Sequence, residues 1–236
     1  MTIQVEVIDE GRPNFAARVT RLDIGAGISK EDASAVAKAI DIYGVLVFPD
    51  QAISDEEQYA FSTHLGQMET ATGDVAKPQD RRLPMNMNDI SNLDKHGRIV
   101  GRDDRRRLFG LGNMLWHSDS SFKATPAKFS LLSAREIPAD GGNTEFADMR
   151  AAWDTLDAKT QDECRPLIAQ HSQLYSRGLL GFDQFSDEDR RRWAPVLQRL
   201  VRTHPSTQRE SLYLSSHIGG ILDWPVPEAR MFNRDL

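Results

Sequence analysis

The stretch NMLWHSDSSF, residues 113–122, places a histidine and a carboxylate two positions apart, at His117 and Asp119. Its aromatic and β-tolerant composition predicts a strand, on which residues i and i+2 point to the same side. The imidazole and the carboxylate would then project together, as ligands for a divalent metal such as Fe(II), Mn(II) or Zn(II). The same spacing is common in strands that bind nothing, so spacing alone leaves both interpretations open.

The composition indicates one globular domain over residues 1–236. Hydrophobic residues make up 39% of the chain and charged residues 27%, which suffices for a sizeable core. The formal net charge of -6 disfavours a nucleic-acid or membrane-surface binder, whose surface would be basic. Cys164 is the single cysteine, which excludes an intramolecular disulfide. With no secretory signal or bilayer-length apolar run in view, we expect a cytoplasmic protein.

The pattern of elements predicts an α+β fold. Alternating apolar residues near the start predict a strand over residues 2–8, and a helix capped by Ser29 should end at Gly44. A short buried strand and a second helix, from Ser54 to Gly66, should follow. Later in the chain we expect a helix over 149–164 and several strands, at 86–91, 114–122, 129–137, 144–149, 200–204 and 211–217.

Two arginine clusters interrupt the polar parts of the chain, at Arg105–Arg107 and Arg190–Arg192. The first could guide an anion inward, but a solvated loop face is the favoured interpretation. The second follows the helix-opening sequence SDED and is favoured still more strongly as a solvated helix face.

The segment Trp116-His117-Ser118-Asp119 resembles the W-H-[ST]-D strand of the Fe(II)/2-oxoglutarate-dependent dioxygenases of the taurine dioxygenase and 2,4-dichlorophenoxyacetate dioxygenase family. In that family this strand supplies two members of a 2-His-1-carboxylate facial triad. The likeness continues in the family's order through YGVLVFPDQAISDEEQYAFSTHLG, LLSAREIPADGGNTEFADMRAAWDTL and RESLYLSSHIGGI. The segments WHSDSSF, GGNTEFADMRAA and SSHIGG look closer to the phenoxyalkanoate-cleaving branch than to the taurine branch.

This resemblance implies a double-stranded β-helix (jelly roll) core with flanking helices. It also implies an enzyme that uses Fe(II), 2-oxoglutarate and dioxygen to hydroxylate a small carboxylate, such as a phenoxyalkanoate ether that then cleaves to a phenol and an oxo-acid. A taurine- or alkylsulfonate-type dioxygenase is the alternative within the family. Outside it stand a non-catalytic β-helix binding domain and a metal-dependent hydrolase that uses the His117–Asp119 pair.

Three further residues receive roles from the resemblance. Thr144, after the Gly141-Gly142 turn, would bind a carboxylate of 2-oxoglutarate, although a β-tolerant residue at a strand start is the plain alternative. Asn113 would face the co-substrate or substrate, although asparagine beside glycine is also usual in turns. His217 would bind a substrate carboxylate, because a nearby anion favours a charged imidazole; otherwise it ends a strand and bonds a loop.

The other histidines are predicted to have lesser roles. His204 ends a strand before a proline turn and could approach the site. His64, His96 and His171 are expected to be structural or solvent-facing.

The chain departs from the family pattern at its C-terminal end. The family's third ligand is a distal histidine in a motif like W-D-N-R-x-x-x-H, and a later arginine pairs with 2-oxoglutarate. Neither pattern occurs before Leu236. In order of preference, we expect part of a longer chain, a truncated inactive product, or replacement of the third ligand by His204 or His217. Missing closing strands would expose apolar edges and favour a homo-oligomer.

Overall fold

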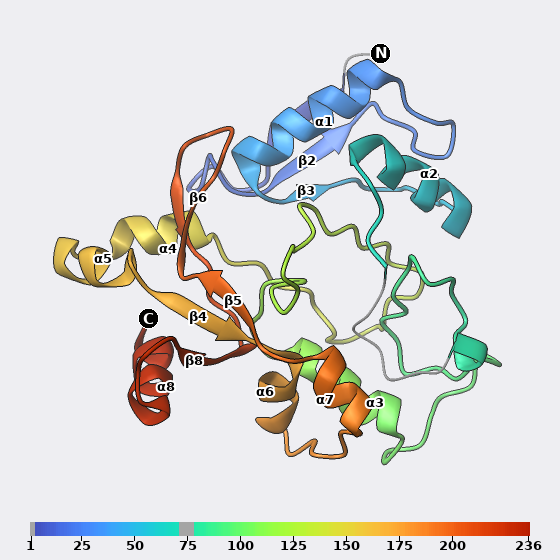
Figure 1. Cartoon of the computed structure of the whole chain (residues 1–236). Helices are drawn as coiled ribbons and strands as arrows, with labels where there is room; N and C mark the ends of the chain where they lie inside the picture. The colour runs from blue at the N-terminus through green and yellow to red at the C-terminus, as the bar shows by residue number, and fades with distance from the viewer. Residues whose placement is uncertain (1–2, 71–77) are drawn as a thin grey trace. The chain divides into compact units, whose positions relative to one another are not determined.

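The computed structural model describes residues 3–70 and 78–236 (Figure 1). They form two compact units. The first contains Met1–Met68, Leu131–Ala151 and Thr203–Arg209, and the second contains Glu69–Ser130, Ala152–Arg202 and Glu210–Leu236. Helices and short strands occur in both, which confirms the predicted α+β class. The assignment of residues 1–236 to a single domain stays a prediction.

A three-stranded sheet and two helices build the first unit. Strand β1 (Gln4–Val7) pairs antiparallel with β2 (Ala17–Thr20), and β2 pairs in parallel with β3 (Leu46–Val47). Helix α1 (Lys30–Tyr43) lies along this sheet, with α2 (Asp55–Leu65) nearby (Figure 1). The expected strand, helix, strand and helix are all present, but β2 was not predicted, and β3 is partly exposed rather than buried.

The caps of these helices explain where they begin and end. The Ser29 side chain accepts the Asp32 N–H, and α1 ends at Gly44, whose φ of 70° favours glycine. Ser54 and Glu57 form a capping box at the start of α2, each side chain bonding the other's backbone N–H.

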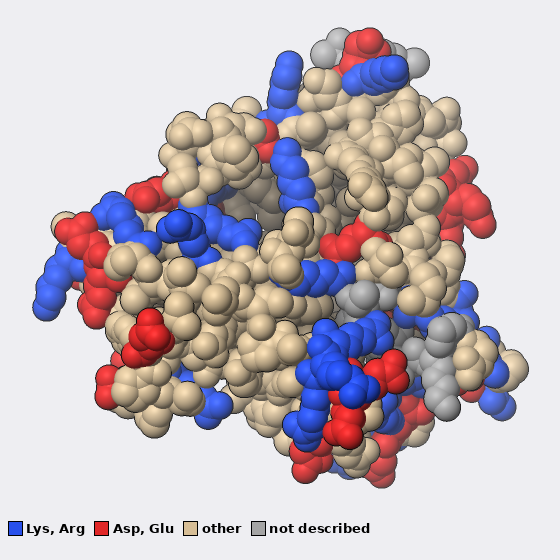
Figure 2. Space-filling view, in the orientation of Figure 1, with Lys and Arg blue, Asp and Glu red and all other residues tan. Residues whose placement is uncertain are grey.

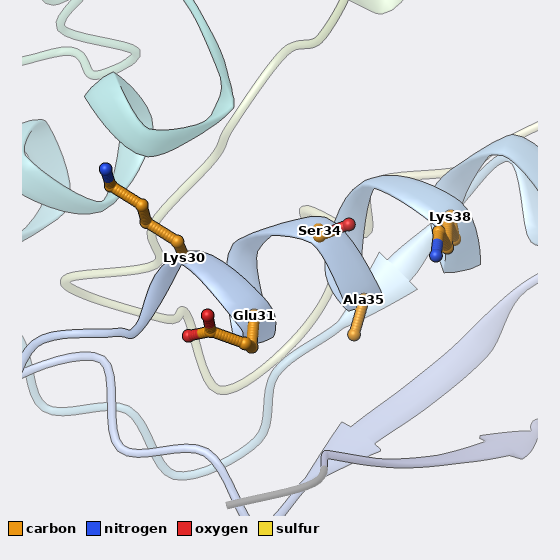
Figure 3. Close-up of a pocket in the computed structure, with 5 residues that line it drawn as sticks. All are labelled: Lys30, Glu31, Ser34, Ala35 and Lys38. Atoms are coloured by element: carbon orange, nitrogen blue, oxygen red, sulfur yellow. The ribbon is translucent and has the colours of Figure 1, made fainter.

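The core of the first unit is small and aromatic in part. Ile24, Val36 and Phe61 are buried together, and Phe48 meets the Phe61 ring edge-on at 5.7 Å. On the outside of α1 a shallow hollow is lined by Lys30, Glu31, Ser34, Ala35 and Lys38 (Figure 3). These side chains point in different directions, so the hollow lacks the convergent polar groups of a binding site.

The second unit is built around an antiparallel sheet in the order β5-β4-β8. Its strands are Val196–Arg199, Ile168–His171 and Ile218–Ile221, and α8 (Val226–Asp235) packs beside β8 (Figure 1). Rings of Phe109, Phe182 and Trp193 form a cluster where α3 (Arg105–Gly110), α6 (Gln173–Gly178) and α7 (Asp187–Arg192) gather.

The remaining elements are short. Strands β6 (Val201–Thr203) and β7 (Glu210–Leu212) form a two-stranded sheet, so the strands expected over 200–204 and 211–217 are confirmed in part. The helix expected over 149–164 is two helices, α4 (Met149–Thr155) and α5 (Ala158–Cys164), because Asp157 caps a new start. The 3-10 turns η1 (Pro78–Asp80) and η2 (Leu111–Met114) complete the described elements.

Four stretches predicted as strands are not strands in the described structure: 86–91, 114–122, 129–137 and 144–149. Their β-tolerant composition was the sole basis for that prediction. Composition indicates only that the side chains suit the pleated surface of a sheet. A strand also needs a second strand beside it, with which its backbone forms a ladder of hydrogen bonds. None of these stretches has such a ladder.

Charged side chains of both signs alternate where α3 and α7 lie (Figure 2). Arg105 pairs with Asp189 at 3.0 Å and Arg106 with Asp104 at 3.1 Å. The cluster Arg105–Arg107 therefore begins a helix rather than a loop, and two of its members already have carboxylate partners. Within the residues the structure describes, no helix has the length and apolarity needed to cross a bilayer.

We expect Ser54→Ala to lower the free energy of unfolding by about 1 kcal/mol, because the α2 capping box loses its hydroxyl. Urea denaturation measures the loss. Ser34→Ala is the matched control, since Ser34 is exposed within α1 and caps nothing. Equal unfolding free energies for the two variants would show that the capping box contributes no stability.

Candidate active site

The segment containing the His117–Asp119 pair is held in place mainly by serines. The Ser216 N–H donates to the Trp116 carbonyl oxygen at 2.9 Å. The Ser118 hydroxyl donates to the Leu214 carbonyl oxygen at 2.8 Å, and its N–H donates to Ser215 Oγ at 3.3 Å. One backbone bond and two serine bonds thus replace the expected ladder, and they turn Ser118 away from its two neighbours.

The imidazole and the carboxylate lie side by side, as the spacing predicted. Nε2 of His117 is 3.2 Å from Oδ1 of Asp119, and the two side chains are 25% and 59% exposed. The hydrogen bond between them raises the pKa of His117 and lowers the pKa of Asp119. Ser130 also bonds the Asp119 carboxylate and lowers its pKa further.

A second contact fixes the orientation of the His117 ring. Nδ1 of His117 donates to the Leu115 carbonyl oxygen at 2.6 Å. Nδ1 keeps its proton for the Leu115 carbonyl oxygen, so a metal that displaces the proton shared by Nε2 and Asp119 would find a nitrogen lone pair on Nε2. A nitrogen and a carboxylate oxygen this close together suit a divalent metal of the first transition row. The two residues therefore fit as two donors of a metal centre.

His217 lies against this pair on the protein side. Its ring is 2% exposed and its centroid is 5.8 Å from that of His117 and 4.9 Å from that of Phe122. Nδ1 of His217 is 2.9 Å from the Ser176 hydroxyl. Burial, together with the charge of Arg177, lowers the pKa of His217 to about 3. The ring is therefore neutral, whereas the sequence argument expected an anion to favour its charged form.

Arg177 was not singled out from the sequence. Its side chain is 4% exposed, and its guanidinium lies 4.5 Å from the centroid of the Phe109 ring. It also lies directly over Gly112, where an added Cβ would be 2.1 Å from Nη1. Gly112 belongs to the LGNM turn, five residues before His117. Any side chain at this position would collide with the guanidinium of Arg177, so the position of Arg177 requires a glycine here. The signal in the sequence was this glycine, which we had interpreted as turn chemistry for Asn113.

His171, predicted to be structural or solvent-facing, is a fully buried residue of β4. Its ring stacks on Tyr213 with centroids 5.5 Å apart, and neither ring nitrogen has a hydrogen-bond partner. Burial, together with the charge of the nearby Arg202, lowers its pKa to about 4. The second unit therefore contains two buried neutral histidines close to buried or half-buried arginines.

The other predicted site residues are less closely tied to the pair. Asn113 is exposed in η2, four positions before His117. Thr144 is exposed and belongs to the first unit, after Gly141 and Gly142, whose φ values of 71° and 72° confirm the predicted turn. The structure does not test the proposed contacts of either residue with 2-oxoglutarate, which stay predictions.

His204 also belongs to the first unit and has partners there. Its Nδ1 accepts the Thr207 N–H at 3.3 Å, and its Nε2 is 3.6 Å from Asp41 Oδ1. Across residues 3–70 and 78–236, no three histidine, cysteine, aspartate or glutamate side chains are grouped to hold a metal ion. The described part of the chain thus presents two donors together, and a third protein ligand stays a prediction.

Comparison with known proteins shows to which family the chain belongs. A profile of the family described as taurine catabolism dioxygenase TauD, TfdA family, matches residues 8–236. The chain is 38% identical over 224 residues to an alpha-ketoglutarate-dependent 2,4-dichlorophenoxyacetate dioxygenase of Cupriavidus pinatubonensis, covering 95% of the chain and 78% of the relative. It is 34% identical over 187 residues to a (S)-phenoxypropionate/alpha-ketoglutarate-dioxygenase of Sphingobium herbicidovorans, covering 76% and 60%.

Solved structures agree with the sequence relatives. The crystal structure of AAD-2 in complex with Mn(II) and N-oxalylglycine matches with a TM-score of 0.95 and 52% identity, covering 100% of the chain and 81% of that protein. A putative alpha-ketoglutarate-dependent 2,4-D dioxygenase from Burkholderia xenovorans matches with a TM-score of 0.81 and 35% identity, covering 99% and 77%.

The buried His171 predicts a pH dependence of stability. Its pKa falls from 6.5 to about 4 on folding, so the unfolded chain takes up a proton that the folded chain refuses. Stability contributed by the neutral ring is complete above pH 6.5 and is lost as the pH falls toward 4. At about 1.4 kcal/mol per pKa unit, the loss amounts to about 3 kcal/mol.

We expect His171→Phe to remove this part of the slope, because phenylalanine can stack on Tyr213 and takes up no proton. Urea unfolding at several pH values between 4 and 7 measures the slope. His64→Phe, at an exposed position of α2, is the matched control and should retain the wild-type slope. A His171→Phe slope equal to that of the wild type would contradict the assignment.

Proposed function

The chain belongs to the TauD/TfdA family of dioxygenases, and on that premise we propose that it is an Fe(II)- and 2-oxoglutarate-dependent dioxygenase. The observation that supports this most directly is the 3.2 Å approach of His117 Nε2 to Asp119 Oδ1, with Nδ1 bonded to a carbonyl oxygen. We assign His117 and Asp119 as metal ligands. When bound, Fe(II) with 2-oxoglutarate and dioxygen would supply the oxidant for a substrate C–H bond.

The protein's own residues orient this pair. The Leu115 carbonyl oxygen holds the proton on Nδ1 of His117, so that Nε2 stays free for the metal. Ser118 fixes the backbone between the ligands through its bonds to residues 214 and 215. The ring of His217 packs edge-on against His117 and in turn against Phe122, which covers the protein side of His117.

We further propose that the substrate is a small carboxylate of the phenoxyalkanoate ether class. The named activities of the 2,4-dichlorophenoxyacetate and phenoxypropionate relatives support this class. Hydroxylation of the carbon beside the ether oxygen forms a hemiacetal, which releases a phenol and leaves an oxo-acid. The solved taurine dioxygenase that matches is 20% identical, so it supports the fold and not an alkylsulfonate substrate.

The remaining parts of the proposal follow from the family. The double-stranded β-helix is the proposed core arrangement, with Thr144 and Asn113 facing 2-oxoglutarate and His217 facing the substrate. A homo-oligomer and a cytoplasmic location are proposed on the sequence arguments given above. None of these is tested by the geometry around His117.

We expect the chain to give a weak visible charge-transfer band when Fe(II) and 2-oxoglutarate are added without oxygen. His117→Ala and Asp119→Ala should each weaken metal binding by more than about a hundredfold and abolish the band, because each removes a ligand. His96→Ala is the matched control, since His96 is an exposed loop histidine. A band that persists in either ligand variant would assign the metal to other donors and overturn the proposed centre.

A further inference from the structure

Arg177 is a buried cation without a carboxylate partner in the described structure. Its side chain is 4% exposed, yet no acidic group among the described residues forms an ion pair with it. Several more exposed arginines do have such partners, including Arg82 with Asp89 and Arg165 with Glu210. A buried guanidinium is usually paired, because removing its charge from water is costly.

The contacts that Arg177 does make leave donors free. Nη1 is 3.2 Å from the Ser176 hydroxyl, and the flat face of the guanidinium lies on the Phe109 ring at 4.5 Å. Nε is buried and has no hydrogen-bond partner. A guanidinium has five N–H donors in a planar fork, which matches the two oxygens of a carboxylate. Among the residues that the structure describes, no anion fills this place.

The position of Arg177 connects it to the proposed metal centre. It covers Gly112 in the turn that precedes the His117 segment, and it shares Ser176 with His217. Arg177 therefore places a positive charge beside the Ser176–His217 contact, on the protein side of the His117–Asp119 pair.

We propose that Arg177 binds the carboxylate of the primary substrate and thereby selects anionic substrates. This inference rests on the proposed function, because it names the group that recognises the substrate of that same site. His217, bonded to the Ser176 hydroxyl, keeps this hydroxyl in place beside the guanidinium. Gly112 is the positioning residue, since any side chain there would displace the guanidinium.

The experiment is direct binding of 2,4-dichlorophenoxyacetate and of its uncharged primary amide to the chain, measured by titration calorimetry with and without Mn(II). The wild type should prefer the acid. Arg177→Met should weaken binding of the acid by about tenfold to a hundredfold, the range for a hydrogen bond to a charged group, and bind the amide as the wild type does. Gly112→Ala keeps the charge but moves it, and should show the same selective loss.

A stability measurement separates binding from a structural role. Arg177→Met should be as stable as the wild type or more stable without ligand, because it removes an uncompensated buried charge and methionine can pack on Phe109. The acid should raise the melting temperature of the wild type and not that of Arg177→Met. Arg190→Met is the matched control: Arg190 also faces a ring, that of Phe185 at 5.9 Å, but it is exposed on α7. This control should bind the acid normally.

Each contrary result has a distinct meaning. If Arg177→Met binds the acid as tightly as the wild type does, Arg177 is not the anchor and this inference fails alone. If the variant instead loses affinity for 2-oxoglutarate in the presence of Mn(II) and keeps the acid, the guanidinium serves the co-substrate and the inference is again overturned. If the wild type binds neither acid nor amide, the proposed substrate class fails with it.

Discussion

The candidate site depends on how residues 116–118 are attached to residues 214–216. One backbone bond and the two bonds of Ser118 fix this attachment, and all three lie within one compact unit. The attachment sets the direction of His117 and brings its ring to 5.8 Å from that of His217. Because His217 in turn bonds the Ser176 hydroxyl, the positions of α6 and Arg177 are linked to the metal-binding pair through short, directional contacts.

Near these contacts, buried charged and polar groups lack hydrogen-bond partners among the described residues. Burying a guanidinium without a carboxylate costs several kcal/mol, and the unbonded nitrogens of His171 add a further cost. Such costs destabilise the folded chain unless the missing group is supplied from outside. Proteins commonly accept this kind of local instability where a ligand must bind, since a preorganised site has less reorganisation left to do on binding.

The sequence was sufficient for features that depend on neighbouring residues. The ends of α1 and α2 follow from Ser29, Gly44 and the Ser54–Glu57 box, which act within one helical turn. It was insufficient where distant residues decide the outcome. Composition alone predicted strands at four stretches that lack a partner, and nothing local to SQLYSRG indicated that Arg177 would be buried. That burial is produced by Gly112 and Phe109, more than sixty residues earlier in the chain.

The side-by-side placement of His117 and Asp119 did not require the strand from which it was argued. Alternation of side chains comes from extended backbone, whereas a strand also requires the ladder. Here the serines supply the constraint that a ladder would have supplied, and Ser118, the residue between the ligands, is itself the main attachment. The intervening residue of the H-x-D pair thus has a physical role of its own. A small hydroxyl-bearing residue at this place can bond the adjacent segment while its two neighbours stay directed at each other.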